Sequence, residues 1–177
     1  SIVVIGEPYN LWIAGTQVTS ANASNILGDD LSEEGSVASV SFDAAENTLT
    51  LNGATITPES EVSGIAYMGE DDLTISLKGA NRVEGSMGCA AIVYDDDSDT
   101  APTLTFVKGD AEGSCSLQLV ATDEATIFGF GEVSCIGLIM FDEVVDDGVH
   151  TASIVGYPVL DVTDDVTFAD GQKWASI

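Results

Sequence analysis

One phrase recurs along this chain and constrains its fold more than any other feature. Residues 47–56 read NTLTLNGATI, residues 72–83 read DLTISLKGANRV, and residues 103–109 read TLTFVKG. Self-similarity at a spacing of about 20 to 50 residues is typical of stacked architectures, because one repeat cannot bury its apolar face without neighbours. Leu49 aligns with Leu73, 24 residues later, and Leu73 aligns with Leu104, 31 residues later.

A repeat of about two dozen residues with short apolar strands favours a solenoid over a propeller, whose blades need about 40 residues. We therefore predict an all-β, right-handed parallel β-helix. The longer third coil indicates an insertion at residues 95–102. Corner turns are expected at Gly53, Gly79 and Gly109, where a tight bend favours glycine.

We expect a single domain over residues 1–177, divided into an N-terminal cap (1–40) and β-helix coils (41–177). Two strand-like stretches flank Gly15 as in a hairpin, and Trp12 is suited to covering the open end of the stack. At the other end, Trp174 is a candidate cap, and an uncovered strand edge there would instead support dimer stacking. The last predicted strand covers residues 159–162.

The charge balance is extreme and limits the classes of partner. The chain has 30 acidic and four basic residues, for a net charge of −26. Such a charge repels nucleic acid and anionic membrane surfaces and favours cations. No stretch approaches the roughly 20 apolar residues of a membrane span, so membrane insertion is not expected. Residues 1–5 lack the basic start and the length of a signal peptide.

Acidic residues gather just before the Leu-Thr strand of successive coils. If the coils stack in phase, carboxylates about 5 Å apart repel by roughly 1 kcal/mol in water and more in a partly buried site. Calcium relieves such repulsion, since it accepts six to eight oxygen ligands in loose geometry. The alternative is a solvated acidic edge that binds nothing specific. The candidate calcium ligands are Asp71, Asp72, Asp95, Asp96, Asp97 and Asp99.

Tyr67 and Tyr94 occupy the same phase of the repeat, and Phe141 is a candidate to continue the column. An exposed aromatic column stacks against sugar rings, but Tyr67 lies two residues from Ile65 and shares its face, which favours the core. The corner lysines Lys78 and Lys108 and the nearby Arg82 either contact an acidic sugar or offset neighbouring carboxylates. The candidate carbohydrate-binding residues are therefore Tyr67, Tyr94, Lys78, Arg82 and Lys108.

The three cysteines lie in small, apolar surroundings and are expected to be buried. Cys89 and Cys115 lie about one repeat apart, so they are the one pair for which a disulfide is considered. No spacing of Cys and His residues fits a zinc site.

Two segments carry a resemblance to a known family. Residues 9–22 (YNLWIAGTQVTSAN), residues 47–54 (NTLTLNGA) and the later repeats resemble secreted bacterial β-helix proteins described as carrying a carbohydrate-binding domain. The resemblance covers about residues 9–110. It implies an extracellular or cell-surface location, a polysaccharide or surface glycan as partner, and a shape like that of pectate lyases, some of which use calcium. No lyase catalytic motif matches residues of this chain.

These observations lead to three hypotheses about function. The first is a noncatalytic extracellular carbohydrate-binding module with Ca²⁺ as candidate cofactor. The second is a structural or adhesive module of the cell surface whose acidic face keeps it in solution. The third is a calcium-dependent polysaccharide lyase, in which Lys or Arg acts as the base and calcium neutralises a uronate.

Overall fold

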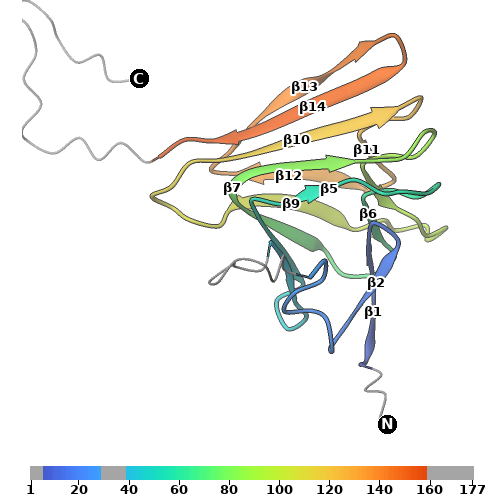
Figure 1. Ribbon diagram of the computed structural model, residues 1–177, viewed down its shortest axis with the longest axis vertical. Coiled ribbons are helices and arrows are strands. Elements are labelled where there is room, and N and C mark those ends of the chain that lie inside the picture. The colour runs from blue at the N-terminus through green and yellow to red at the C-terminus, as the bar shows by residue number, and fades with distance from the viewer. Residues whose placement is uncertain (1–5, 29–38, 159–177) are drawn as a thin grey trace, which may run out of the picture.

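The computed structural model describes residues 6–28 and 39–158, which form fourteen β-strands and no helix (Figure 1). Three sheets enclose one core. The first sheet contains, in spatial order, β11 (Ile127–Phe128), β8 (Ile92–Tyr94), β6 (Ile65–Tyr67), β1 (Pro8–Ile13) and β2 (Thr16–Thr19). The second contains β12 (Glu132–Ile136), β9 (Thr103–Lys108), the first half of β7 (Leu73–Glu84), β4 (Thr48–Asn52) and β3 (Val40–Asp43). The third contains β13 (Ile139–Asp146), β14 (Val149–Gly156), β10 (Cys115–Thr122), the second half of β7, and β5 (Thr55–Ile56).

The chain passes through the second, third and first sheets in turn, as a solenoid does. The coils are β4-β5-β6, β7-β8 and β9-β10-β11, and equivalent strands of successive coils pair in parallel. Alternate residues point inward, so that Leu49, Ile75 and Phe106 are fully buried. The predicted all-β parallel β-helix is confirmed. In the described residues no helix is long and apolar enough to cross a membrane.

The predicted register is right at two places and wrong at one. Tyr67 pairs with Tyr94, and Leu73 pairs with Leu104, as the repeat predicts. Leu49, however, pairs with Ile75 and not with Leu73. A shift of two residues keeps the same side chains inward, so the apolar pattern cannot distinguish the two registers.

The corner between the second and third sheets fixes the true register. Gly53 and Gly79 both have φ of +65°, a left-handed conformation that disfavours other residues, and they lie 26 residues apart, as do Leu49 and Ile75. Gly109 does not adopt a positive φ, which corrects the third predicted corner. A Cβ atom at Gly109 would instead lie 2.6 Å from Lys78 Cγ, so this glycine permits a close approach of side chains.

Antiparallel strands flank the stack on both sides, and Figure 1 shows the blue N-terminal hairpin and the orange C-terminal hairpin at opposite ends. The predicted N-terminal hairpin is present: β1 and β2 meet at Ala14 and Gly15, and β1 pairs with β6. At the other end β14 pairs antiparallel with β10, and β13 forms the outer edge. Phe141 lies in β13, away from the tyrosines, so it does not continue their column. The predicted strand 159–162 and Trp174 lie outside the described residues.

Candidate functional site

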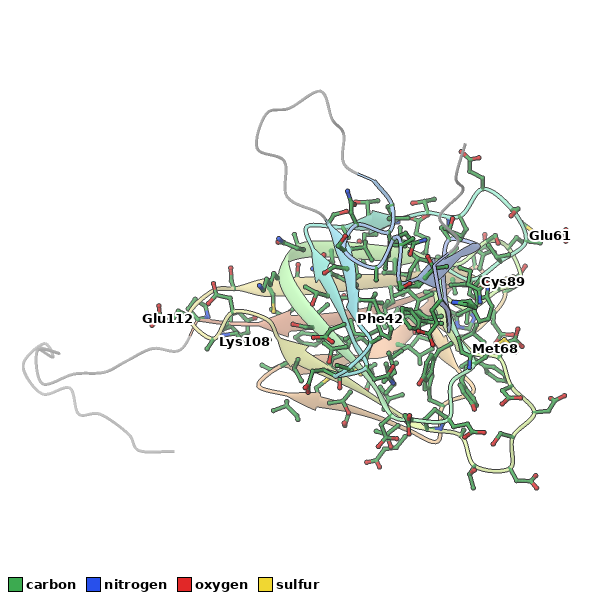
Figure 2. All side chains as sticks on the ribbon, turned by 90° about the horizontal axis from the view of Figure 1, so that it is seen from below. Phe42, Glu61, Met68, Cys89, Lys108 and Glu112 are labelled. Atoms are coloured by element: carbon green, nitrogen blue, oxygen red, sulfur yellow. The ribbon has the colours of Figure 1, made fainter. Side chains whose placement is uncertain are left out.

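An open cleft of about 400 Å³ lies beside the N-terminal hairpin. It lies where the edges of β1 and β6 meet the turns that precede β4 and β7. Figure 2 labels Phe42 and Met68, two residues of its wall. The lining residues are Tyr9, Asn10, Leu11, Phe42, Ala44, Asn47, Tyr67, Met68, Gly69, Glu70, Asp71 and Asp96.

Tyr67 reaches the cleft from the core. Its hydroxyl donates to the Asp71 carbonyl oxygen at 2.7 Å and accepts from Asn47 Nδ2 at 2.9 Å. Asn47 Nδ2 also donates to the Asp72 carbonyl oxygen at 2.8 Å, so this carboxamide ties the first coil to the second. Burial raises the pKa of the Tyr67 phenol, which therefore stays protonated at neutral pH. The side chain is buried, and its hydroxyl is already bonded to Asp71 and Asn47.

The tyrosine column is internal. Tyr67 and Tyr94 are buried, and their ring centroids lie 6.1 Å apart. Phe130, not Phe141, completes the cluster, 6.5 Å from Tyr67 and nearly parallel to it. The faces of these rings are covered by protein and cannot stack on a sugar, so the core alternative holds for both tyrosines.

Another aromatic pair borders the cleft. Tyr9 and Phe42 lie 5.5 Å apart with their rings tilted by 60°, and Tyr9 is half-buried. Asn10 is exposed beside them, and its carbonyl oxygen accepts a hydrogen bond from Met68 N at 2.9 Å. Apolar ring surface next to amide and carboxylate groups suits a ligand that is itself apolar on one face and hydroxylated at its rim.

The structure separates the six predicted calcium ligands. Asp71 and Asp96 line the cleft together with Glu70. Asp72 Oδ1 accepts a hydrogen bond from Thr103 N at 2.8 Å and so fixes the start of β9. Asp95 lines another hollow with Glu61 and Glu124, while Asp97 and Asp99 lie in the exposed turn before β9. Within residues 6–28 and 39–158, no three His, Cys, Asp or Glu side chains converge as a metal-binding group.

The three predicted basic residues lie outside the cleft. Arg82 Nε donates to Glu84 Oε1 at 2.6 Å, and Arg82 also donates to Gln118 on the third sheet. Lys108 Nζ donates to the carbonyl oxygens of Ala111 and Tyr157, and Figure 2 shows Lys108 far from Met68. Lys78 is exposed at the end of the first half of β7. None of these side chains can act on a ligand in the cleft.

The cysteines are free in the described structure. Cys115 begins β10 opposite Gly79, near Lys108, whereas Figure 2 shows Cys89 at the other end of the molecule from Lys108. The considered disulfide is therefore absent. Cys115 is buried, as predicted, and burial raises the pKa of its thiol; Cys89 and Cys135 are half-buried.

Sequence reasoning missed the contributions of the N-terminal segment to the cleft, namely Tyr9, Asn10, Phe42 and Asn47. The sequence signal for these residues was weak, because Asn47 is only the first residue of the repeat phrase and Tyr9 belongs to the hairpin.

Comparison of the chain with protein-family models, curated proteins and solved structures finds no match. The geometry of the site must therefore carry any argument about its use.

Proposed function

We propose that this protein is a noncatalytic carbohydrate-binding module and that the cleft beside the N-terminal hairpin holds the sugar. The combination of the half-buried ring of Tyr9, which packs against the buried Phe42, with the polar groups of Asn10 and Asn47 supports this proposal. Sugars present apolar ring faces, which pack against an aromatic side chain, and hydroxyl groups, which hydrogen-bond to the amide groups of the cleft. The proposed extracellular or cell-surface location rests on the sequence resemblance alone.

We include Ca²⁺ in the proposal as a ligand shared between protein and sugar. Asp71 and Asp96 line the same cleft, and sugar hydroxyls and water would supply the remaining oxygen ligands. With few protein ligands, the ion would bind weakly in the absence of sugar. The proposal therefore predicts that calcium and sugar each increase the affinity for the other.

A glycan array with and without calcium tests the proposal. The double variant Asp71→Asn/Asp96→Asn should lose calcium-dependent glycan binding, and Asn10→Ala should weaken binding with or without calcium. Asp97→Asn/Asp99→Asn removes the same charge from the exposed turn outside the cleft and is the matched control. Glycan binding that survives all cleft variants, or no glycan binding by the unmodified protein, would contradict the proposal.

A second candidate, a structural or adhesive module, is favoured by the outer strand β13. All eight of its residues are exposed, including Ile139, Phe141 and Val144, the last of which is 65% exposed. Among the described strands β13 pairs only with β14, and apolar residues along such an outer edge promote association with another protein. Concentration-dependent sedimentation that disappears in Phe141→Ser/Val144→Ser, together with a negative glycan array, would favour this candidate.

The lyase hypothesis receives no comparable support, and we do not propose it. Its chemistry needs a base beside the bound uronate. Of the residues that the structure describes, those that line the cleft include no Lys, Arg or His.

A further inference from the structure

The outward face of the first sheet carries a row of apolar side chains. Trp12 of β1 pairs with Ala66 of β6, Ala66 with Val93 of β8, and Val93 with Phe128 of β11. The residues on either side of Trp12, Ala66 and Val93 in their strands are buried, so the row itself faces outward. Because neighbouring strands lie about 4.8 Å apart, the row extends about 14 Å and has an aromatic residue at each end.

Two adjoining hollows, of about 220 and 290 Å³, lie along this row. Trp12 lines the first and Phe128 lines the second, while Val62, Ala66 and Asp95 line both. We call the two hollows together the outer groove. Its floor is apolar, and Phe128 is 56% exposed, so this ring is accessible to a ligand.

Hydrogen bonds between successive coils hold one wall of the outer groove. Val62 N donates to Ser86 Oγ at 2.7 Å, and Ser86 N donates to the Val62 carbonyl oxygen at 3.1 Å. Cys89 N in turn donates to the Ser86 carbonyl oxygen at 2.8 Å. Figure 2 shows Glu61 and Cys89, which belong to these turns, on the side of the molecule opposite Lys108. The wall is thus formed before any ligand binds, which lowers the entropic cost of binding.

Three carboxylates border this apolar floor. Glu61 and Asp95 are exposed, and Glu124 is half-buried, with its Oε1 accepting from Ala125 N at 2.8 Å. Within residues 6–28 and 39–158 none of the three forms an ion pair, and no Lys, Arg or His lines the outer groove. Glu61 precedes β6 and Glu124 precedes β11, two strand spacings away, so these negative charges are distributed along the groove.

Charge and shape together indicate an extended organic cation as the occupant. A metal ion needs several oxygen ligands around one centre, and the three carboxylates do not converge as a metal-binding group in the described part of the chain. An aliphatic chain with ammonium groups can contact Ala66 and Val93 while its charges lie near the carboxylates. Trp12 and Phe128 add to the attraction, because aromatic ring faces bind cations.

We propose that the outer groove binds a linear aliphatic polyamine, which lies across the strands of the first sheet. The inference is independent of the proposed carbohydrate site, since among the described residues the groove and the cleft share only Met68. A net charge of −26 attracts every cation without selectivity. The apolar floor makes this site selective, because it favours a cation whose charges are joined by methylene groups.

Three probes of equal charge test the selectivity. Spermidine has an aliphatic chain, hexaamminecobalt(III) has none, and dilysine amide places its charges on a peptide. Calorimetry at constant ionic strength measures each Kd. Spermidine should bind the unmodified protein at least about tenfold more tightly than either of the other probes, because only spermidine matches both the floor and the carboxylates.

Carboxylate variants test the location. Glu61→Gln/Glu124→Gln removes two charges from the outer groove and should weaken spermidine binding about tenfold. Glu112→Gln/Glu132→Gln removes the same charge elsewhere and is the matched control; Figure 2 shows Glu112 far from Glu61. The control should change the Kd by less than about twofold.

An aromatic pair of variants tests the end of the groove. Phe128→Ser should weaken spermidine binding about threefold, and Phe141→Ser, on the exposed strand β13, should not change it. Thermal unfolding first shows that each variant is folded. Equal affinity for spermidine and hexaamminecobalt(III), equal losses in the matched controls, or dilysine amide binding as tightly as spermidine would overturn the inference. None of these outcomes bears on glycan binding in the cleft.

Discussion

At the scale of single residues, Asn81 connects neighbouring coils of the repeat. Asn81 is buried at the corner of the second coil, where its Oδ1 accepts from Ala54 N at 2.8 Å and its Nδ2 donates to the carbonyl oxygens of Lys78 and Ser116. The side chain therefore joins three successive coils. All of these hydrogen bonds run to backbone atoms.

Asn81→Ala should reduce the free energy of unfolding by about 2 to 3 kcal/mol, because it leaves buried backbone groups without partners. Urea unfolding measures this change. Gln118→Ala, on an exposed side chain of the neighbouring strand, is the control and should cost less than about 0.5 kcal/mol. Equal stability of the two variants would show that the Asn81 bonds contribute no more than surface contacts.

Glu143 links the C-terminal hairpin to the third coil. Its Oε1 accepts from Thr126 N at 2.7 Å, and its Oε2 lies 3.0 Å from His150 Nδ1. Burial acts to raise the pKa of this carboxyl, but the hydrogen bonds with His150 and Thr126 outweigh it and lower the pKa below its ordinary value. The ionised form thus stabilises the folded state above the unfolded pKa, and this contribution disappears as the pH falls through the lowered folded pKa.

Glu143→Gln should therefore cost about 1 kcal/mol at pH 7 and progressively less below about pH 4. Urea unfolding of both proteins across pH 3 to 7 measures the difference. A cost that does not change with pH would mean that packing, not ionisation, explains the effect of the substitution.

At the scale of elements, the sequence predicts the strands wherever the repeat is regular. It does not always predict which strands pair with each other. The match between Gly64–Tyr67 and Ala91–Tyr94 predicted the pairing of β6 with β8 correctly, because both strands carry the same alternation. The turn between Tyr94 and Leu104 is four residues longer than that between Tyr67 and Leu73, which agrees with the predicted insertion. Beyond Gly109 the stacking changes, because β14 runs antiparallel to β10. No local sequence pattern predicts this reversal of strand direction.

The same limit applies to the candidate site. Tyr67, Asp71 and Asp96 belong to the repeat and could be identified, although the predicted stack of six acids is dispersed by turns of unequal length. Tyr9 and Asn10 reach the cleft because β1 pairs antiparallel with β6, some 54 residues away. Single-sequence periodicity contains no information on that pairing.

Two glycines should respond differently to alanine substitution. Gly53 has a positive φ and open space around its Cα, so Gly53→Ala should cost only the strain of the left-handed backbone, about 1 kcal/mol. At Gly129, which has φ of +92°, a Cβ atom would also lie 2.4 Å from the Tyr94 carbonyl oxygen. Gly129→Ala should therefore be more destabilising by at least about 2 kcal/mol in chemical unfolding. Equal costs would contradict the packing of the first sheet described above.

At the scale of the whole molecule, a charge of −26 acts on stability and on ligand binding together. Self-repulsion among carboxylates opposes folding, and monovalent salt screens it. The melting temperature should therefore rise with sodium chloride, by about 2 to 4 °C for each kcal/mol gained.

Calcium binding predicts a further effect that screening does not. At constant ionic strength, millimolar calcium should raise the melting temperature more than magnesium does, and Asp71→Asn/Asp96→Asn should remove the difference. Equal shifts with both ions, or a calcium effect that persists in the variant, would show that these two carboxylates bind no calcium specifically and are only part of the solvated surface.

The most direct measurement for the account as a whole is nuclear magnetic resonance of the ¹⁵N-labelled protein during titration with a hexasaccharide selected on the glycan array. Binding in the cleft should shift the amide signals of Asn10, Met68 and Asp71 together along one 1:1 binding curve, while those of Arg82 and Lys108 stay fixed. Saturable shifts confined to residues outside the cleft, or no shifts with any selected sugar, would contradict it.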